Sequence, residues 1–520
     1  MNRTWLLLRI QIINTLPINE IREPGNKKKN TAILMGIGMI TIALLLFSYN
    51  ILTAQALAQT GAQKLIPAYM AAISSFAIII LTMFRSNDIL FGSRDIEMLF
   101  SLPIKFGEII SSKFLFLYLL NFIVSFIFMV PGGIIWIINT DMDISRFTLY
   151  YITIFFVPLL PMCIASFIGI LITLVTSRLK NRNIISLILS FAAIGLIGYI
   201  SAYSSQEGSD ISILSTMLAQ QITRIYPPSK LFLEHLGFSA LAGMGTFILL
   251  SFMVFYLFVK ITASRYLLFR TLATTSSQYV IRKGTAKAHS PFIALYRKEL
   301  GRFFNSYTTV LNTGFGVIFL CIFSIFLLVV PLQQLGNYVG VANINEFLAD
   351  YAPVVIASML SLSCPAASSI SLEGRNIWIL QSSPISTKMI LNSKLAVTLT
   401  LHAFGYLFAV PAIILQVDMN FIQFISLLLV PICYSLFTVT LGISLNKKYP
   451  NYEWDNEVTV VKQSMPAMIS SIFAMIAIGI PVLLHLLLAF PLLPTLLGTA
   501  TILIIAAGIM HHKACMASYL

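Results

Sequence analysis

Two histidines, His402 and His485, are the side chains inside the long apolar segments of this chain whose type fits proton or ion chemistry. An ionisable group inside a membrane is costly and often marks such a site. These sites are usually built with carboxylates, but all 19 Asp and Glu residues fall in loops or at segment ends, with Glu108 and Asp350 nearest to the apolar cores. We therefore interpret both histidines first as hydrogen-bond partners between helices, and second as functional groups.

Metal and nucleotide chemistry find little support in the sequence. His511, His512 and Cys515 lie close together, but they lack the second pair of ligands of a usual zinc site. A chain that holds ATP itself needs the pattern G-x-x-x-x-G-K-[ST], whose main-chain amides surround the phosphates. The nearest cluster, GNKKKNT at 25–31, has one glycine with lysines almost directly behind it. The sequence thus predicts no catalytic group, no metal and no cofactor bound by the chain itself.

A twenty-residue motif occurs twice, 281 positions apart, in polar breaks between apolar segments. The first copy, RDIEMLFSLPIKFGEIISSK, covers 94–113, and the second, RNIWILQSSPISTKMILNSK, covers 375–394. Nine of the 20 columns are identical, and they include the pairs Ser101 and Ser382, Pro103 and Pro384, and Lys113 and Lys394. A repeat of this period in 520 residues indicates two equivalent halves, as in many transporters.

In each copy of the motif, a proline closes a short serine-containing turn and a helix-compatible stretch follows. Proline fits the first turn of a helix and cannot extend the segment before it. We therefore expect two short helices in each copy, with a bend at Pro103 or Pro384. Lys113 and Lys394 would lie where the next apolar segment enters the membrane. The alternative to a partner-binding loop is an interfacial elbow whose lysine contacts headgroups.

The composition predicts an all-α polytopic membrane protein. Hydrophobic residues make up 58% of the chain and charged residues 10%, whereas soluble domains contain about 25% charged residues. Twelve apolar runs are long enough to cross a bilayer, six in each half, which predicts two halves of the same orientation. They lie at 31–56, 65–84, 114–137, 147–175, 184–203, 238–261, 308–331, 351–370, 395–416, 421–445, 466–488 and 492–511.

The basic residues that give the net charge of +14 are concentrated in alternate loops between the predicted spans. With the N-terminus inside, 29 of the 33 Lys and Arg residues fall on the cytoplasmic side. This bias is the positive-inside rule, and it predicts that both termini are cytoplasmic. It explains the basicity without nucleic acid, while the run Lys27 to Lys29 allows a secondary attraction to anionic membrane lipids.

Two amphipathic stretches each precede the first apolar segment of a half. They are MNRTWLLLRIQII at 1–13 and SPFIALYRKELGRFF at 290–304. We expect both to form helices that lie in the membrane interface. The predicted organisation is a first half at 1–263, a cytoplasmic linker with the second amphipathic helix at 264–307, and a second half at 308–520.

At the repeated loops, the chain resembles the permease subunit of a bacterial ATP-binding-cassette exporter of the ABC type-2 superfamily. It is most similar to the long, duplicated permeases of Gram-positive bacteria. The resemblance is carried by the SLPI and SSPI loops with their trailing SK, by YPPSKLFLEHL at 226–236 and by KKYPNYEWDNEVTVVKQS at 447–464. It covers nearly the whole chain and is uninformative about the cargo.

The resemblance implies a cytoplasmic coupling helix in each half that docks on a separate ATPase subunit. That partner would be a cytoplasmic ATP-binding protein in two copies, and it would bind ATP and Mg²⁺. The docking surface would contain Arg94, Glu97, Ser101, Pro103 and Lys113 in the first half, and Glu373, Arg375, Ser382, Pro384 and Lys394 in the second. Gly92 is aligned with Glu373, so the two surfaces are unequal.

In the outer loop at 204–237, the resemblance implies short helices that re-enter the outer leaflet and close the transport path. Tyr226, Pro227 and Pro228 would form this outer gate. A simple surface loop fits the two prolines equally well.

The sequence therefore predicts a permease of the bacterial cytoplasmic membrane and not an enzyme. Because the spans contain almost no charge, the cargo would be amphipathic or hydrophobic, such as a peptide, a lipid or a drug. Two alternatives remain. An ion-coupled secondary transporter would need the carboxylates that the spans lack. A membrane-embedded enzyme or scaffold acting on a lipid or a precursor would have to use the histidines near 511 or the acidic residues at 453–457.

Overall fold

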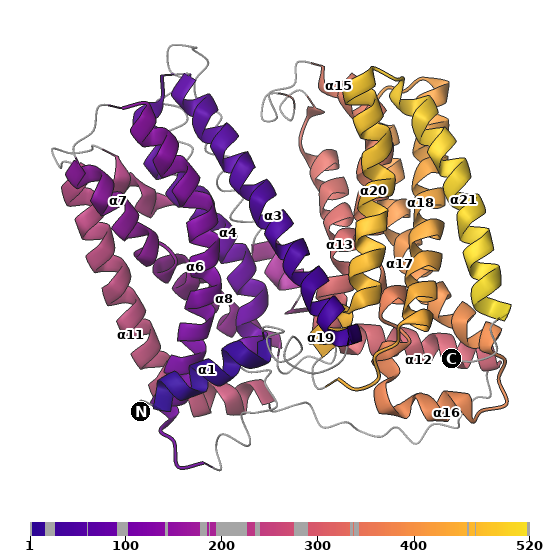
Figure 1. Cartoon of the computed structure of the whole chain (residues 1–520), viewed down its shortest axis with the longest axis horizontal. Helices are drawn as coiled ribbons and strands as arrows, with labels where there is room; N and C mark the ends of the chain where they lie inside the picture. Colours follow the sequence, from indigo (N-terminus) through magenta and orange to yellow (C-terminus); the bar gives the residue numbers. More distant parts are fainter. Residues whose placement is uncertain are drawn as a thin grey trace. The chain divides into compact units, whose positions relative to one another are not determined.

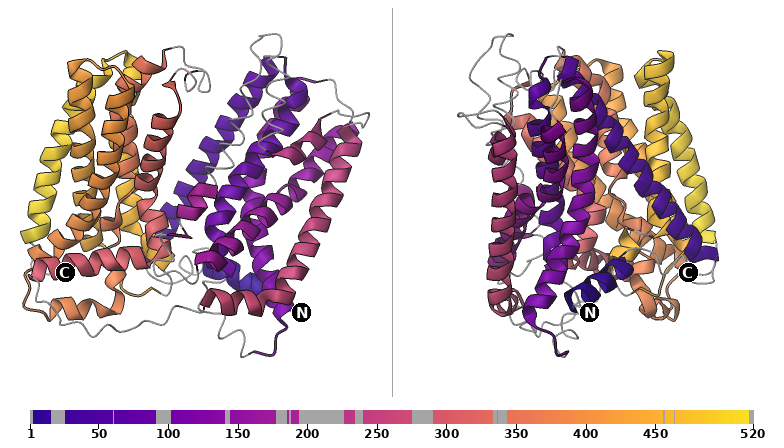
Figure 2. Two further views of the ribbon diagram at one scale, coloured as in Figure 1. Left: turned by 180° about the vertical axis from the view of Figure 1, so that it is seen from behind. Right: turned by 60° about the vertical axis from the view of Figure 1, so that its left-hand side comes forward.

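The computed structural model describes residues 3–15, 26–59, 61–90, 102–140, 144–176, 185–186, 188–193, 226–233, 240–274, 290–332, 336, 343–454, 457–462 and 464–516. All regular elements in these ranges are helices. They form two compact units, Met1–Ile281 and Arg282–Leu520, which are drawn in Figures 1 and 2.

Eleven of the described helical segments are long and apolar enough to cross a bilayer. They correspond to eleven of the twelve predicted spans, and the remaining one, at 184–203, lies mostly outside the described residues. The prediction of an all-α polytopic membrane protein is therefore confirmed.

In the first unit, long helices pack around a core that includes Met70, Tyr150 and Phe247. Its elements are α1 (Arg3–Thr15), α3 (Asn26–Gln59), η1 (Gln63–Leu65), α4 (Ile66–Leu90), α6 (Phe106–Ile138), α7 (Ile144–Phe156), α8 (Leu159–Thr176), η3 (Pro227–Phe232) and α11 (Ala240–Thr274). Helix α4 packs on α6 and α8, and the amphipathic α1 packs on α6 across the foot of the long helices (Figure 1). The predicted fourth span is divided into α7 and α8, and Pro158, which has no N–H to donate, lies at the break.

In the second unit, α18 is central and packs on α15, α17, α20 and α21. The elements are α12 (Pro291–Asn305), α13 (Tyr307–Val329), α15 (Ile344–Ser361), η4 (Pro365–Ala367), η5 (Ser371–Asn376), α16 (Ile377–Gln381), α17 (Thr387–Gln416), α18 (Phe421–Lys448), α19 (Glu457–Val461), α20 (Met465–Leu488) and α21 (Leu492–Met516). Helices α13 and α15 approach closely at Gly316, where a Cβ would lie 1.9 Å from the carbonyl oxygen of Met359.

The two motif copies have the same local geometry where both are described. Helices α6 and α17 begin 281 positions apart, which is the spacing of the motif. Before each helix, the amide after the proline donates to the carbonyl before it: Ile104 to Leu102 at 2.7 Å, and Ile385 to Ser383 at 2.8 Å. The same residue spacing thus produces the same tight turn in both units.

The structure corrects the expected helix pattern around the prolines. Pro103 and Pro384 lie in the turn, before the N-cap residues Lys105 and Ser386, and not in the first helical turn. The prediction of a second short helix after each proline is wrong, because that stretch is the start of a long helix that continues through the next apolar segment. In the second copy, α16 is the short helix before the bend, whereas 94–101 lies outside the described residues.

Two helices lie across the predicted boundaries of the linker at 264–307. Helix α11 continues to Thr274, past the predicted end of the first half at 263, because its helical pattern extends into polar sequence. Helix α12, which we assigned to a linker, packs on α13 and α17 and so belongs to the second unit.

Candidate functional site

The site begins with the amphipathic helix α12, which buries Leu295, Glu299 and Phe303 at intervals of four residues. This interval places the three side chains on one helical face. The face packs on α17, and Figure 1 shows α12 lying across the foot of the long helices of its unit. A carboxylate in the middle of a buried apolar face requires a partner of opposite charge.

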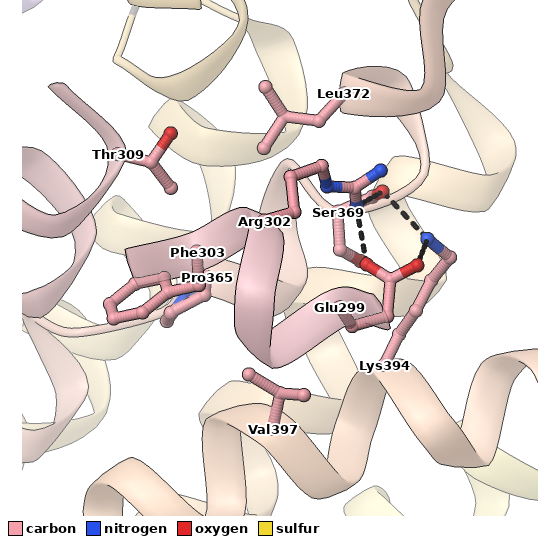
Figure 3. A pocket seen from close by; sticks show the side chains of 9 residues that line it. All are labelled: Glu299, Arg302, Phe303, Thr309, Pro365, Ser369, Leu372, Lys394 and Val397. Carbon is pink, nitrogen blue, oxygen red and sulfur yellow. Dashed lines mark hydrogen bonds and ion pairs between the residues drawn. The ribbon is translucent and has the colours of Figure 1, made fainter. Parts of the chain in front are cut away.

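Lys394, the last residue of the second motif copy, is that partner. Its Nζ lies 2.8 Å from Glu299 Oε1 and 2.7 Å from Glu373 Oε1, and it donates to the Ser369 carbonyl at 2.9 Å. The residue is only 1% exposed, and its three contacts use all three ammonium donors. Figure 3 shows Lys394 extending from α17 toward Glu299 and Ser369.

Arg302 and Lys298, both on α12, complete the arrangement. Arg302 Nη1 lies 3.1 Å from Glu373 Oε2, and its Nη2 pairs with Glu299. The half-exposed Lys298 lies 2.9 Å from both carboxylate oxygens of Glu373. We call Lys298, Glu299, Arg302, Glu373 and Lys394 the ion cluster. With three cations and two anions, it carries a net charge of +1.

A cavity of about 20 Å³ adjoins the ion cluster (Figure 3). Glu299, Arg302 and Lys394 line one side, and Phe303 and Val397 contribute apolar surface. This volume accommodates about one water molecule. The cavity is therefore too small for a cargo or a nucleotide, and the cluster is better described as a structural joint than as a binding pocket.

The loop that carries Glu373 is held from a second direction by α18 and the segment after it. Asn446 Oδ1 accepts hydrogen bonds from the main-chain N–H groups of Ile370 at 2.8 Å and Ser371 at 3.1 Å. Trp454 Nε1 donates to the Ser371 carbonyl at 2.8 Å, and its ring lies against Gly374, whose φ of +58° suits glycine. The KKYPNYEW stretch therefore positions this loop.

Tyr452, in the same segment, has a pKa that is shifted by its surroundings. Burial raises the pKa of its phenol, and the negative charge of Glu373 raises it further. The Tyr452 side chain also packs beside Ile377 and Leu380 of α16. The phenol therefore remains neutral and acts as a packing residue.

Trp378 and Ile379 form the solvent-exposed side of α16, which we call the apolar tip. Trp378 is 61% exposed and Ile379 is 52% exposed, while Ile377 and Leu380 on the opposite side pack against Leu295 of α12. An exposed Trp beside an aliphatic side chain is typical of residues that dominate protein interfaces, and Trp is also common at membrane interfaces.

The predicted docking residues of the second copy divide into two groups. Arg375, Ser382 and Pro384 are exposed, close to the tip of α16. Glu373 and Lys394 have buried side chains. The ion cluster holds their charged groups inside the unit, and their place in a docking surface stays a prediction.

In the first copy, Pro103 is exposed and its carbonyl accepts a hydrogen bond from Arg3 Nη1 of α1 at 2.6 Å. Lys113 is buried, like Lys394. The amphipathic helix and the loop therefore contact each other in both units. The remaining predicted residues of this copy, Arg94, Glu97 and Ser101, lie outside the described residues.

At the predicted outer gate, Pro227 and Pro228 begin the short helix η3, and Tyr226 is its N-cap residue. Tyr226 is buried in the core of the first unit, and η3 packs on α4 and α11. The contact with α11 is close, since a Cβ at Gly243 would lie 2.0 Å from the carbonyl oxygen of Leu231. The described part of the outer loop is thus packed into the helices, and its role as a gate stays a prediction.

His402 is buried and bonded through both ring nitrogens. Nδ1 lies 2.6 Å from Ser435 Oγ, and Nε2 bonds the Ser363 carbonyl. In the first unit, Asn121 and Thr82 lie 281 positions before His402 and Ser363, and Asn121 donates to Thr82 Oγ1 at 2.8 Å. This correspondence favours the interpretation of His402 as a hydrogen-bond partner between helices.

The other histidines have local contacts. His485 Nδ1 lies 2.7 Å from the Phe490 carbonyl oxygen at the end of α20. His511 contacts the sulfur of Cys515 one helical turn away, at 3.7 Å from Nε2. Among the residues described, no three His, Cys, Asp or Glu side chains gather in a group that could hold a metal ion.

Sequence reasoning missed several side chains of this site. Glu299 had a detectable signal, because it lies between Leu295 and Phe303 on the apolar face of its helix. Trp378 also had one, as a Trp in a polar break. The bond from Trp454 to Ser371 had none, since it joins residues 83 positions apart.

The long apolar helices and the amphipathic helices at their foot define a polytopic α-helical membrane protein. The chain belongs to the family described as membrane protein of 12 TMs, whose model matches residues 30–513. That description agrees with the twelve apolar runs of the sequence. Neither a curated protein nor a solved structure matches the chain.

Proposed function

We propose that the chain is the permease subunit of an ABC exporter of the bacterial cytoplasmic membrane. Separate cytoplasmic ATP-binding subunits, in two copies, would bind ATP and Mg²⁺ and power transport. The observation that carries this proposal is α16, whose apolar tip is exposed while its base is fixed to two other helices through the ion cluster. An element that transmits a conformational change from a partner needs an exposed surface for binding and a firm connection to the rest of the protein.

The contacts of α16 indicate how its movement would be transmitted to the membrane spans. Helix α16 is joined to α17 by a tight turn at Ser383 to Ile385, and Lys394 ties the beginning of α17 to Glu373 just before α16. A displacement of the tip is therefore passed to α17, which is a candidate membrane span. The resemblance of the SLPI and SSPI loops to permease coupling loops supports the same assignment in both units.

The cargo would be an amphipathic or hydrophobic molecule, such as a peptide, a lipid or a drug. Buried polar residues of the described spans are mainly neutral, with Ser, Thr and Asn most frequent. An ion-coupled mechanism gains nothing from His402, because both its nitrogens already bond within the protein. Two arrangements of the helices with different cargo affinity would then alternate as ATP is hydrolysed.

The test is co-purification of the full chain, in mild detergent, with its candidate ATPase subunit. Trp378→Ala with Ile379→Ala should weaken ATPase binding by about tenfold or more, as expected for an interface centre. The control is Phe421→Ala, because Phe421 is an exposed aromatic at the other end of its unit. Equal binding by the two variants, or no ATPase retained by the wild-type chain, contradicts the proposal.

A further inference from the structure

Helix α21 has one packed face and one exposed apolar face. Its buried residues recur at intervals of four and seven positions, and the helix packs on α18 and α20. On the opposite side, Ile502, Ile505 and Ile509 are 67%, 63% and 52% exposed. Intervals of three and four residues place these three side chains in one stripe along the helix. Because α21 is a candidate membrane span, this stripe is a surface for the hydrocarbon chains of lipids.

The isoleucine stripe leads into basic residues at the end of α21. His512 and Lys513 follow Ile509 by three and four positions, so they continue the same face, and both are exposed. In Figure 1, α21 ends at the foot of its unit, which is the end at which α12 lies. One face of this helix is therefore apolar along the span and basic where the span ends.

Helix α18 ends at the same place and adds Lys447 and Lys448 in its last turn. Lys447 Nζ donates to the Ala514 carbonyl at 2.8 Å, which satisfies one of the last carbonyl groups of α21 and joins the two helix ends. Lys448 is exposed, and its Nζ lies 5.3 Å from the centre of the Tyr449 ring. We call Lys447, Lys448, His512 and Lys513 the basic patch.

The lysines of the basic patch outnumber the carboxylates of the segments that carry it. Helix α18, the stretch after it to Trp454, and α21 contain three lysines and one carboxylate, that of Glu453. The net charge of these segments is therefore +2 with neutral histidines. The positive-inside rule accounts for lysines at one end of a span, but it does not require two spans to bring them together. The contact between Lys447 and Ala514 does so here.

We propose that the basic patch binds the headgroup of an anionic phospholipid, one of whose acyl chains lies along the isoleucine stripe of α21. A phospholipid fits both parts, because its phosphate lies at the membrane interface and its chains lie in the hydrocarbon core. Clustered basic side chains next to a span attract such headgroups. Lys448 and Lys513 supply exposed charge, whereas Lys447 holds the two helix ends in place. Lipid binding at this site is independent of the proposed function.

Photo-cross-linking tests the site on the full-length chain in phosphatidylcholine vesicles that contain a trace of photoreactive phosphatidylglycerol. With the reactive group in the acyl chain, peptide mapping should place cross-links within 502–516. Photoreactive phosphatidylcholine with the same chains should label these residues less, because its headgroup has no net charge. This comparison uses the wild-type chain and so does not depend on the folding of a variant. Equal labelling by the two lipids overturns the proposal.

Variants assign the recognition to the basic patch. Lys448→Gln with Lys513→Gln should lower phosphatidylglycerol labelling of 502–516 by about tenfold or more, since two exposed cations are lost. The control, Lys64→Gln with Lys230→Gln, removes two exposed lysines of the first unit and should change labelling by less than about twofold. Equal losses in the two double variants overturn the patch as the cause.

Soluble glycerol 3-phosphate separates a lipid site from a phosphate site, because it has the charge of a headgroup but no acyl chain. In excess, it should leave phosphatidylglycerol labelling of α21 nearly unchanged. Displacement of the lipid by glycerol 3-phosphate overturns the role of the isoleucine stripe. Ile505→Ala with Ile509→Ala should lower labelling by phosphatidylglycerol, and unchanged labelling would contradict that role as well.

Discussion

Lys394 and Glu373 lie at the two ends of the second motif loop, and their charged groups are 2.7 Å apart across 21 residues of sequence. The loop between them contains α16 and the SSP turn. The pair therefore joins the two ends of the segment that contains α16.

Lys394→Met should lower the stability of the chain strongly. It leaves two buried carboxylates with one cation fewer, and breaking a buried pair costs about 3 to 5 kcal/mol. Thermal unfolding in detergent measures the loss. Lys388→Met, at an exposed position of the same helix, is the control and should change stability by less than about 0.5 kcal/mol. Similar melting curves for the two variants would contradict the role of the cluster.

Gly374→Ala should be destabilising by about 1 to 2 kcal/mol, because φ is +58° there and the new methyl group would press on Trp454. Gly245→Ala offers the opposite case. Gly245 is helical with nothing within 4 Å of a Cβ, so alanine should be neutral or stabilising by about 0.5 to 1 kcal/mol. Chemical unfolding of the two variants compares them directly, and the same sign for both would argue against the strained turn.

Asn446→Ala should release the loop from α18. It removes the acceptor of two buried main-chain N–H groups, at a cost of about 1 to 3 kcal/mol. Limited proteolysis should then cut faster within 369–386. The control is Asn451→Ala, because the Asn451 side chain is exposed. Equal cleavage of the two variants would show that Asn446 does not hold the loop.

His402→Asn should preserve function if His402 only joins helices, because Asn121 does so at the corresponding position. The chain-dependent change in ATPase rate should be within about twofold of wild type between pH 6 and 8, whereas an essential proton carrier would cost at least about a hundredfold. His402→Ala should lower the melting temperature more than His402→Asn. Loss of all activity in His402→Asn would revive the ion-coupled alternative.

Much of the fold was predictable because each element needs only local information. Apolar runs of spanning length predicted eleven described spans, and the two amphipathic stretches predicted α1 and α12. Span ends were less accurate. Helix α15 begins at Ile344, earlier than predicted, because the polar residues Glu346 and Asp350 are helical too.

The site was predictable in location but not in chemistry. The repeated motif indicated the right loop, and the predicted residues included Lys394, the last residue of the motif, and Glu373, two residues before its first. Their burial was not visible, because it depends on two residues of an earlier helix: Arg302 lies 71 positions and Glu299 lies 74 positions before Glu373. Charge in a polar break looks exposed in sequence, and only the packing of α12 shows that it is enclosed.

The order of the cluster along the chain has a consequence for biosynthesis. All five of its side chains lie between Lys298 and Lys394, whereas the supporting Asn446 and Trp454 come later. As the chain emerges from the ribosome, the cluster has all its members once α17 has been made. The second unit is thus able to assemble the foot of its long helices early, and α18 then binds a loop that is already in place.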